Sequence, residues 1–226
     1  MGTLYLVRHG QASFGAADYD QLSPLGHRQS VRLGEFFRQH GVQFEAVLTG
    51  TLKRQQQTWA GIAEGMGQSG SAVQQPLAWP GLNEYDSAAV LEAIQAQLPA
   101  EPHSTEGYRQ HFRLLRDGLR QWMAGVVSPR GMPSYDGFVQ GVTSALDHVR
   151  SRHSGNVLIV SSGGPIATAV GHVLGTTPET TIELNLRIRN TAVSEFAFNP
   201  KRHHLVSFNA LPHLHQPADA DWITYA

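Results

Sequence analysis

Three short segments carry residue types that could bind and transfer an anionic group. They are Arg8-His9-Gly10, the stretch that contains Arg54, and Ser162-Gly163-Gly164. Arginine is always charged at working pH, and its planar fork of donors matches a phosphate or a carboxylate. An imidazole can act as a nucleophile, and glycine lets the backbone approach a ligand closely. Together these types predict a phosphate pocket.

Each segment also has a structural reading. Arg8 could pair with a surface carboxylate at a capped strand end, and Arg54 could be a solvated helix arginine. Ser162-Gly163-Gly164-Pro165 could be an ordinary turn between a strand and a helix, since proline fits the first helical turn. The same two glycines, however, leave backbone N–H groups open to an anion.

The position of the three segments favours the phosphate pocket, because each follows a predicted strand. Apolar, β-prone runs cover residues 3–7, 44–48 and 157–160. A continuous apolar run is typical of a strand covered on both faces, as in a parallel sheet. Ligands of such sheets bind in the crevice past the carboxyl ends of the strands. The helix expected after the second strand adds its positive N-terminus to that crevice.

The remaining elements follow from periodicity. Apolar stripes predict helices over residues 52–66, 87–98, 108–122, 138–149 and 166–174, and alternation predicts strands over 192–198 and 205–208. Residues 99–106 and 126–137 predict loops. We therefore expect an α/β fold, a three-layer sandwich with a mainly parallel central sheet. It forms a single domain, 1–226, with a helical lid insertion at about 86–152.

The predicted lid carries five arginines whose role its sequence leaves open. Four lie on one face of the helix at 108–122, where such a stripe is a solvated surface or has one member that reaches the substrate. They are Arg109, Arg113, Arg116 and Arg120, and the fifth is Arg130.

Composition excludes several classes of function. The net charge of −1 gives no basic field for nucleic acid or an anionic membrane. The chain has no cysteine, which excludes disulfides and thiol catalysis. No two histidines have the H-x-x-x-H spacing with an intervening Glu that is typical of a zinc enzyme. No apolar run reaches the roughly 18 residues of a membrane span, and none has signal-peptide form. We expect a cytoplasmic protein that needs no metal or cofactor and that can form a homodimer.

Four motifs, in order, resemble the histidine phosphatase superfamily, which includes the cofactor-dependent phosphoglycerate mutases. They span about residues 3–215. The motifs are Leu6-Val7-Arg8-His9-Gly10 with Leu22-Ser23-Pro24-Leu25-Gly26, then Leu52-Lys53-Arg54-Gln55-Gln56-Gln57-Thr58, Leu82-Asn83-Glu84-Tyr85-Asp86 and Asn209-Ala210-Leu211-Pro212-His213-Leu214. The resemblance implies a phosphoglycerate-mutase-like fold and a phosphorylated small-molecule substrate.

The resemblance also implies a role for each residue. His9 would form a phosphohistidine, and Arg8 and Arg54 would hold the phosphate oxygens. Glu84 would protonate the leaving oxygen and then deprotonate water. As an alternative, Glu84 would only place a favourable charge at the N-terminus of the helix at 87–98. Ser162 and Gly163 would complete the phosphate site, and no metal is needed.

The chain departs from the family at Ser162, where the family motif has a second histidine. Serine donates a hydrogen bond but carries no charge. Losing such a donor costs a factor of about 10² to 10³ in rate. The leading interpretation is a phosphomonoester hydrolase slowed by Ser162. A phosphate-ligand-binding pseudophosphatase and a phosphoglycerate-type mutase are the alternatives.

Overall fold

The computed structural model describes residues 1–13, 20–95 and 104–225. These residues form a six-stranded mixed sheet in the order β3-β2-β4-β1-β5-β6. The strands are β1 (Gly2–Arg8), β2 (Ala46–Thr49), β3 (Leu77–Ala78), β4 (Asn156–Ser161), β5 (Val193–Asn199) and β6 (Arg202–Ala210). Pairs among β1, β4, β2 and β3 are parallel, whereas β5 is antiparallel to both β1 and β6. The mainly parallel sheet predicted from the apolar runs is confirmed.

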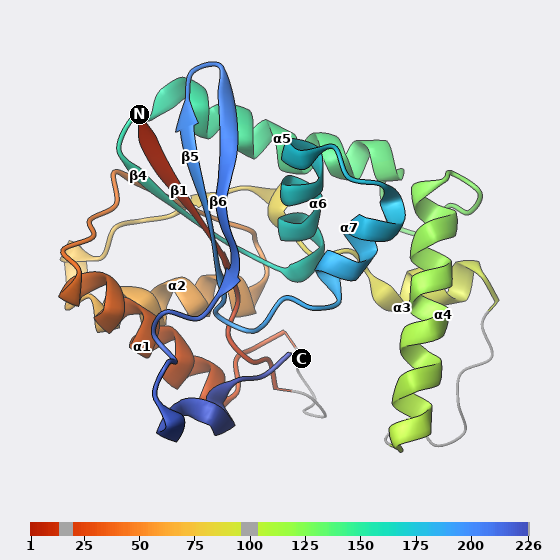
Figure 1. Ribbon diagram of the computed structural model, residues 1–226, viewed down its shortest axis with the longest axis horizontal. Helices are drawn as coiled ribbons and strands as arrows, with labels where there is room; N and C mark the ends of the chain where they lie inside the picture. The colour runs from red at the N-terminus through yellow and green to blue at the C-terminus, as the bar shows by residue number, and fades with distance from the viewer. Residues whose placement is uncertain (14–19, 96–103, 226) are drawn as a thin grey trace.

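Helices cover both faces of this sheet, which gives three layers (Figure 1). The α-helices are α1 (Pro24–Gln39), α2 (Lys53–Gly65), α3 (Ser87–Ala93), α4 (Thr105–Met123), α5 (Tyr135–Arg152), α6 (Gly163–Leu174) and α7 (Pro178–Asn185). Short 3-10 helices cover η1 (Gly70–Ala72), η2 (Pro80–Leu82) and η3 (Pro217–Trp222). In the described part of the chain, no helix is both long and apolar enough to cross a membrane.

Successive side chains of the central strands point to opposite faces and so build two separate cores. On β4, Leu158 and Val160 pack with α1 and α2, through residues such as Phe37 and Ile62. Val157 and Ile159 face the other way, into a larger core that includes α5 and α6. Because both faces are buried, the strands read as continuous apolar runs in the sequence.

Some elements differ from the predictions. The second strand begins at Ala46 rather than Phe44, and α4 begins at Thr105, inside the loop predicted at 99–106. The helix predicted over 87–98 ends at Ala93, and Leu98 lies outside the described residues. Helices α1 and α7 and the two-residue strand β3 were not predicted.

The segment predicted as a lid divides into two parts. Helix α5 packs beside α6 and contributes Phe138, Val142 and Leu146 to the core on that face of the sheet. Helices α3 and α4 lie beyond the edge of the sandwich, although Val90, Leu115 and Leu119 belong to the same core (Figure 1). The first turns of α4 project away from the sandwich (Figure 1). A role as a lid remains a prediction for α3 and α4.

Candidate active site

The parallel strands β1, β4 and β2 bring three functional segments to one edge of the sheet. Arg8 pairs with Ser161 across β1 and β4, and Thr49 pairs with Val160 across β2 and β4. The three carboxyl ends are therefore side by side. His9, Arg54 and Ser162, which follow these ends in the sequence, lie in the same region.

His9 is buried, with only 3% of its surface exposed, and its hydrogen bonds define its tautomer. Its Nδ1 lies 2.7 Å from the carbonyl oxygen of Gly10. A carbonyl oxygen can only accept, so Nδ1 carries the proton and Nε2 keeps a lone pair. Arg54 Nε donates to that Nε2 at 3.2 Å. An anion bound by Arg54 would thus lie beside the nucleophilic nitrogen.

Neighbouring side chains hold the backbone of the His9 turn. The hydroxyl of Thr58 accepts from the Gly10 N–H at 3.0 Å and donates to the Arg54 carbonyl at 2.7 Å. Asn190 Nδ2 donates to the His9 carbonyl at 3.1 Å. A Cβ on Gly10 would lie 2.4 Å from the carbonyl oxygen of Gly26, so only glycine fits between β1 and α1.

The two arginines of the predicted pocket are held in different ways. Arg8 Nη1 donates to the main-chain carbonyls of Ile188 and Tyr225. Arg54 Nη1 pairs with Asp20 Oδ1 at 2.8 Å. Asp20 Oδ2 also accepts from the backbone N–H of Lys53 at 3.0 Å. A carboxylate therefore occupies the N-terminus of α2, which the sequence was expected to offer to phosphate. No sequence signal pointed to Asp20.

Glu84 lies at the start of α6. The backbone N–H of Gly164 donates to its carboxylate, at 3.0 Å to Oε1 and 3.2 Å to Oε2. Glu84 therefore does not occupy the N-terminus of α3, which is capped by Asp86 through the N–H of Ala88 at 2.9 Å. The alternative prediction placed the charge of Glu84 at the N-terminus of the helix at 87–98. The carboxylate lies at the N-terminus of α6 instead. The Gly164 N–H, expected to be open to an anion, is taken by this carboxylate.

The surroundings of His9 and Glu84 shift both groups toward their neutral forms. Burial, followed by the charges of Arg8 and Arg54, holds the pKa of His9 well below its usual range. Burial raises the pKa of Glu84, although the Gly164 hydrogen bond and the same two arginines oppose the rise. Arg8 and Arg54 thus act on both groups. A neutral imidazole and a carboxylic acid are the forms that a nucleophile and a proton donor require.

Ser162 is fully buried and is part of a hydrogen-bonded link between three elements. Its Oγ accepts from Gln55 Nε2 at 2.9 Å, and the same nitrogen donates to the Leu82 carbonyl at 2.9 Å. Gln55 on α2 therefore connects the N-cap of α6 with the loop before Glu84. Binding of phosphate by Ser162 and Gly163 remains a prediction, because no contact of either residue tests it.

His213, from the C-terminal motif, is linked through Thr191 to the backbone at the end of β1. His213 Nε2 lies 3.0 Å from Thr191 Oγ1, whose proton goes to the Asn190 carbonyl at 2.7 Å. His213 is therefore the donor. The Thr191 N–H in turn donates to the Arg8 carbonyl at 3.1 Å. His213 thus supports the backbone on which Arg8 and His9 are carried.

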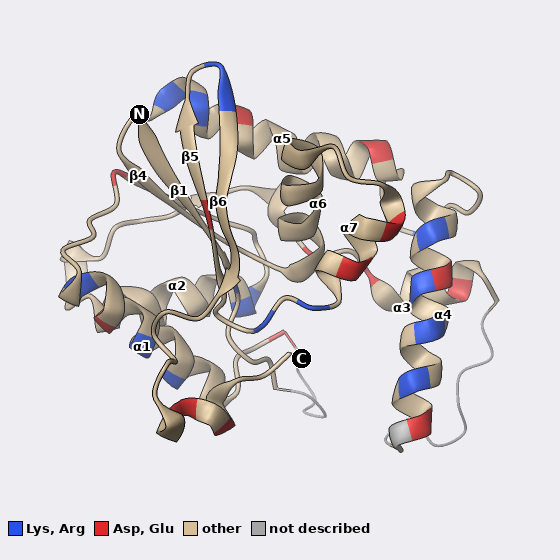
Figure 2. Cartoon of the chain, in the orientation of Figure 1, with Lys and Arg blue, Asp and Glu red and all other residues tan. Residues whose placement is uncertain are grey.

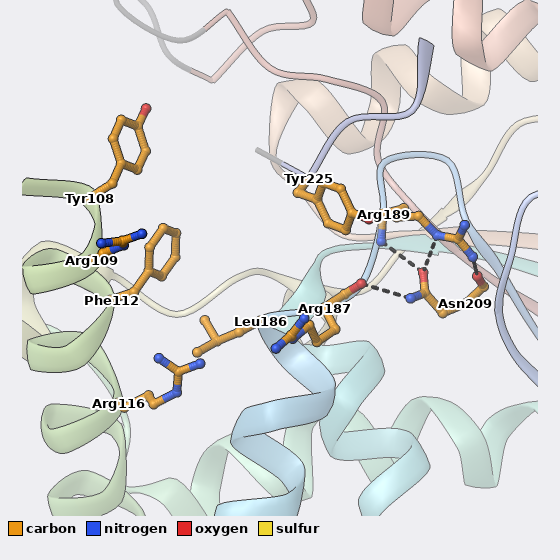
Figure 3. Close-up of a pocket in the computed structure, with 9 residues that line it drawn as sticks. All are labelled: Tyr108, Arg109, Phe112, Arg116, Leu186, Arg187, Arg189, Asn209 and Tyr225. Carbon is orange, nitrogen blue, oxygen red and sulfur yellow. Dashed lines mark hydrogen bonds between the residues drawn. The ribbon is translucent and has the colours of Figure 1, made fainter. Parts of the chain in front are cut away.

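A pocket of roughly 700 Å³ lies beside this site, between α4 and the segments around Leu186 and Tyr225 (Figure 3). Its walls carry four arginines: Arg109, Arg116, Arg187 and Arg189. Figure 2 shows the basic residues spaced along α4. Arg113 and Arg120 of the same helix do not line the pocket. Within residues 1–13, 20–95 and 104–225, no cluster of histidine, cysteine and carboxylate side chains could hold a metal ion.

Comparisons with known proteins give the family. A family model for the histidine phosphatase superfamily (branch 1) matches residues 4–211. A phosphoserine-phosphatase-like protein of Hydrogenobacter thermophilus is 26% identical over 96% of this chain and 99% of its own length. A 2,3-bisphosphoglycerate-dependent phosphoglycerate mutase of Allorhizobium ampelinum is 38% identical over 76 residues. That match spans 30% of this chain and only 36% of the mutase.

Solved structures give the same fold. A phosphoserine phosphatase mutant of Entamoeba histolytica in complex with phosphoserine superposes with a TM-score of 0.65 at 19% identity. The match covers 95% of this chain and 100% of that chain. A Bacillus anthracis phosphoglycerate mutase gives the same TM-score at 18% identity, over 94% of both chains. The family-model match over most of the chain shows that this protein belongs to the histidine phosphatase superfamily.

Proposed function

We propose that the protein is a phosphomonoester hydrolase that works through a phosphohistidine on His9. The observation that carries the proposal is the state of His9: buried, with its proton on Nδ1 and its Nε2 lone pair beside Arg54. Its superfamily contains phosphatases and mutases. Glu84, whose raised pKa favours the acid form, supplies a proton donor in the same pocket.

The reaction has two steps. In the first, Arg54 Nε leaves Nε2 for the phosphoryl oxygens and frees the Nε2 lone pair. The lone pair then attacks phosphorus, the ester P–O bond breaks, and the leaving oxygen takes the proton of Glu84. Arg8 and Arg54 neutralise the charge on the phosphoryl oxygens, and Gly10 steadies the imidazolium through Nδ1. In the second, water attacks phosphorus, gives a proton to Glu84, and the P–N bond breaks to release phosphate.

Hydrolysis is favoured over mutase chemistry by the open surroundings of the site. A mutase must keep its phosphohistidine from water. The pocket next to Arg8 is lined by Tyr108 and Tyr225, whose exposed fractions are 41% and 56%. The pocket beside Arg8 is therefore open to water, which supports hydrolysis as the proposed reaction.

Trapping the intermediate tests the proposal. The protein is incubated with a ³²P-labelled aryl phosphate at mildly acidic pH and then denatured in alkali. We expect an acid-labile, alkali-stable label and release of phosphate. His9→Ala should abolish both, whereas His27→Ala, which removes an exposed histidine of α1, should retain them.

Two results would contradict it. Turnover that survives His9→Ala would remove the phosphohistidine mechanism. A wild-type protein that binds phosphate or vanadate through Arg8 and Arg54 but shows neither label nor turnover would be a phosphate-binding pseudophosphatase.

A further inference from the structure

We infer that the arginine-lined pocket binds the leaving group of the substrate, and that this leaving group joins a flat apolar body to a second, doubly charged anionic group. The inference rests on the proposed function and deepens it. Arg8 Nη1 donates to the carbonyls of Ile188 and Tyr225. Tyr225 lines the pocket, and Ile188 lies between two of its arginines. The pocket therefore lies directly beside Arg8, the proposed phosphate-binding arginine.

Within the part of the chain that the structure describes, two of the four lining arginines are ion-paired and two are not. Arg116 pairs with Glu183 at 2.6 Å and Arg109 with Glu106 at 3.8 Å. For Arg187 and Arg189, no carboxylate lies within 4 Å among the residues that the structure describes. A second phosphate group carries a charge of about −1.5 to −2 at neutral pH and matches the charge of these two arginines, whereas a carboxylate carries only about −1.

Asn209 holds the two unpaired arginines in place before any ligand arrives. Its Oδ1 accepts from the backbone N–H of Arg189 at 2.9 Å, and its Nδ2 donates to the Arg187 carbonyl at 2.8 Å. The Arg189 guanidinium itself donates to Asn209, from Nη2 to the main-chain carbonyl and from Nε to Oδ1. Asn209 adopts a left-handed conformation with φ of 58°, which asparagine tolerates better than most residues. These contacts are drawn in Figure 3. The backbone of residues 187–189 is thus held by the neutral side chain of Asn209.

The remaining walls are apolar and flat. Phe112 projects from α4 toward the opposite wall, where Leu186 and Tyr225 lie (Figure 3). Aromatic side chains favour a planar partner that they can stack against. A leaving group with a ring would lie between these walls, and its anionic end would reach Arg187, with the charge of Arg189 behind it at Asn209 (Figure 3).

Three aryl phosphates with leaving groups of similar basicity test the inference. They are 4-methylphenyl phosphate, 4-(carboxymethyl)phenyl phosphate and 4-(phosphonomethyl)phenyl phosphate. The wild-type kcat/KM should rise in that order. For the phosphonomethyl ester, the ratio to the methyl ester should be about tenfold or more, since each charge contact at a partly exposed site contributes about a few-fold gain.

Arg187→Gln should lower that ratio by about fivefold, because it removes one exposed positive charge from the pocket. Arg113→Gln is the matched control, since it removes an exposed arginine of α4 that does not line the pocket. It should keep the wild-type ratio. Equal kcat/KM for the three esters, or an equal loss of the ratio in both variants, would overturn the inference.

Failure of the proposed function gives a different result. If none of the three esters is hydrolysed, their binding is measured by calorimetry. A preference for the phosphonomethyl ester that Arg187→Gln weakens would support the pocket without catalysis. An absence of preference would refute it independently of turnover.

Discussion

At the scale of single residues, the proposed function assigns phosphate binding to Arg8 and Arg54 and the chemistry to His9 and Glu84. Arg8 and Arg54 supply the positive charge, and burial, followed by their charges, lowers the pKa of His9. His9 therefore stays neutral and nucleophilic well into the acidic range, while the raised pKa of Glu84 keeps its proton available there. The missing element is a further cation at position 162, where a buried serine accepts a hydrogen bond from Gln55. That loss concerns the transition state more than the bound ground state.

Ser162→His should raise kcat on a generic phosphomonoester while changing phosphate affinity only modestly. An imidazolium would stabilise charge on the transferring group, whereas two arginines already neutralise the bound dianion. We expect a gain of about tenfold or more, below the roughly 10² to 10³ that one preorganised donor supplies, because the new side chain must displace Gln55. Steady-state kinetics and the inhibition constant of phosphate measure the two effects.

Folding of this variant must be checked by thermal unfolding, since Ser162 is fully buried and a larger side chain can overpack its surroundings. A well-folded variant with unchanged or lower kcat would show that the pocket is organised around serine and Gln55. In that case the absent histidine would be no handicap.

At the scale of elements, the first turn of α6 positions Glu84, the proposed proton donor. A Cβ on Gly164 would lie 2.2 Å from Glu84 Oε1 and 2.7 Å from Tyr85 Cδ1. Only glycine leaves room for the carboxylate to accept the Gly164 N–H. The glycines after β4 therefore serve two purposes, a tight turn and close approach of Glu84.

Gly164→Ala should slow the enzyme mainly on esters with poor leaving groups. The displaced carboxylate can no longer protonate an alkoxide, whereas a nitrophenolate leaves without a proton. We expect a loss of about 10²-fold or more in kcat on an alkyl phosphate and a much smaller loss on 4-nitrophenyl phosphate. The same pattern should appear in Glu84→Gln. Equal losses on both esters in the two variants would assign Glu84 a structural role at the helix terminus.

The sequence predicted those helices and strands whose signals lie in their own residues. The strands that carry Arg8 and Ser162 were predicted because burial on both faces leaves an uninterrupted apolar run. Helix α1 also begins with local signals, the Ser23 cap and Pro24 in the first turn, so its start is predictable from the sequence. The two residues of β3, Leu77 and Ala78, are exposed and show no alternation. Pairing with β2 alone makes them a strand.

The contacts within the site were less predictable, because they join residues that are distant in the chain. Arg8, Arg54, His9 and Glu84 were predicted from motifs. Asp20 and Gln55 were not, since their roles depend on where the loop before α1 and the first turn of α2 meet. The positions of Arg187 and Arg189 opposite α4 are likewise a consequence of the fold.

At the scale of the whole molecule, buried histidines couple the fold to pH. His213 is buried, and desolvation lowers its pKa to about 3; His203 is half-buried on β6, and desolvation lowers its pKa to about 4. His9 is shifted in the same direction. Above an unfolded-state pKa of about 6.5, each is neutral in both states and contributes no pH dependence. Below it, the unfolded chain binds protons that the folded protein does not, so stability falls with falling pH.

We therefore expect the free energy of unfolding to decrease between pH 7 and pH 5, by roughly 1 kcal/mol per pH unit for each fully buried histidine. Glu84, with its raised pKa, takes up a proton in the folded state first and opposes the loss, but it is one group against several. Urea unfolding at pH 7.5, 6.5 and 5.5 measures the slope. His213→Gln, which can still donate to Thr191, should flatten it, whereas His204→Gln on the exposed side of β6 should not. An unchanged slope in a folded His213→Gln variant would show that His213 is not a source of the pH dependence.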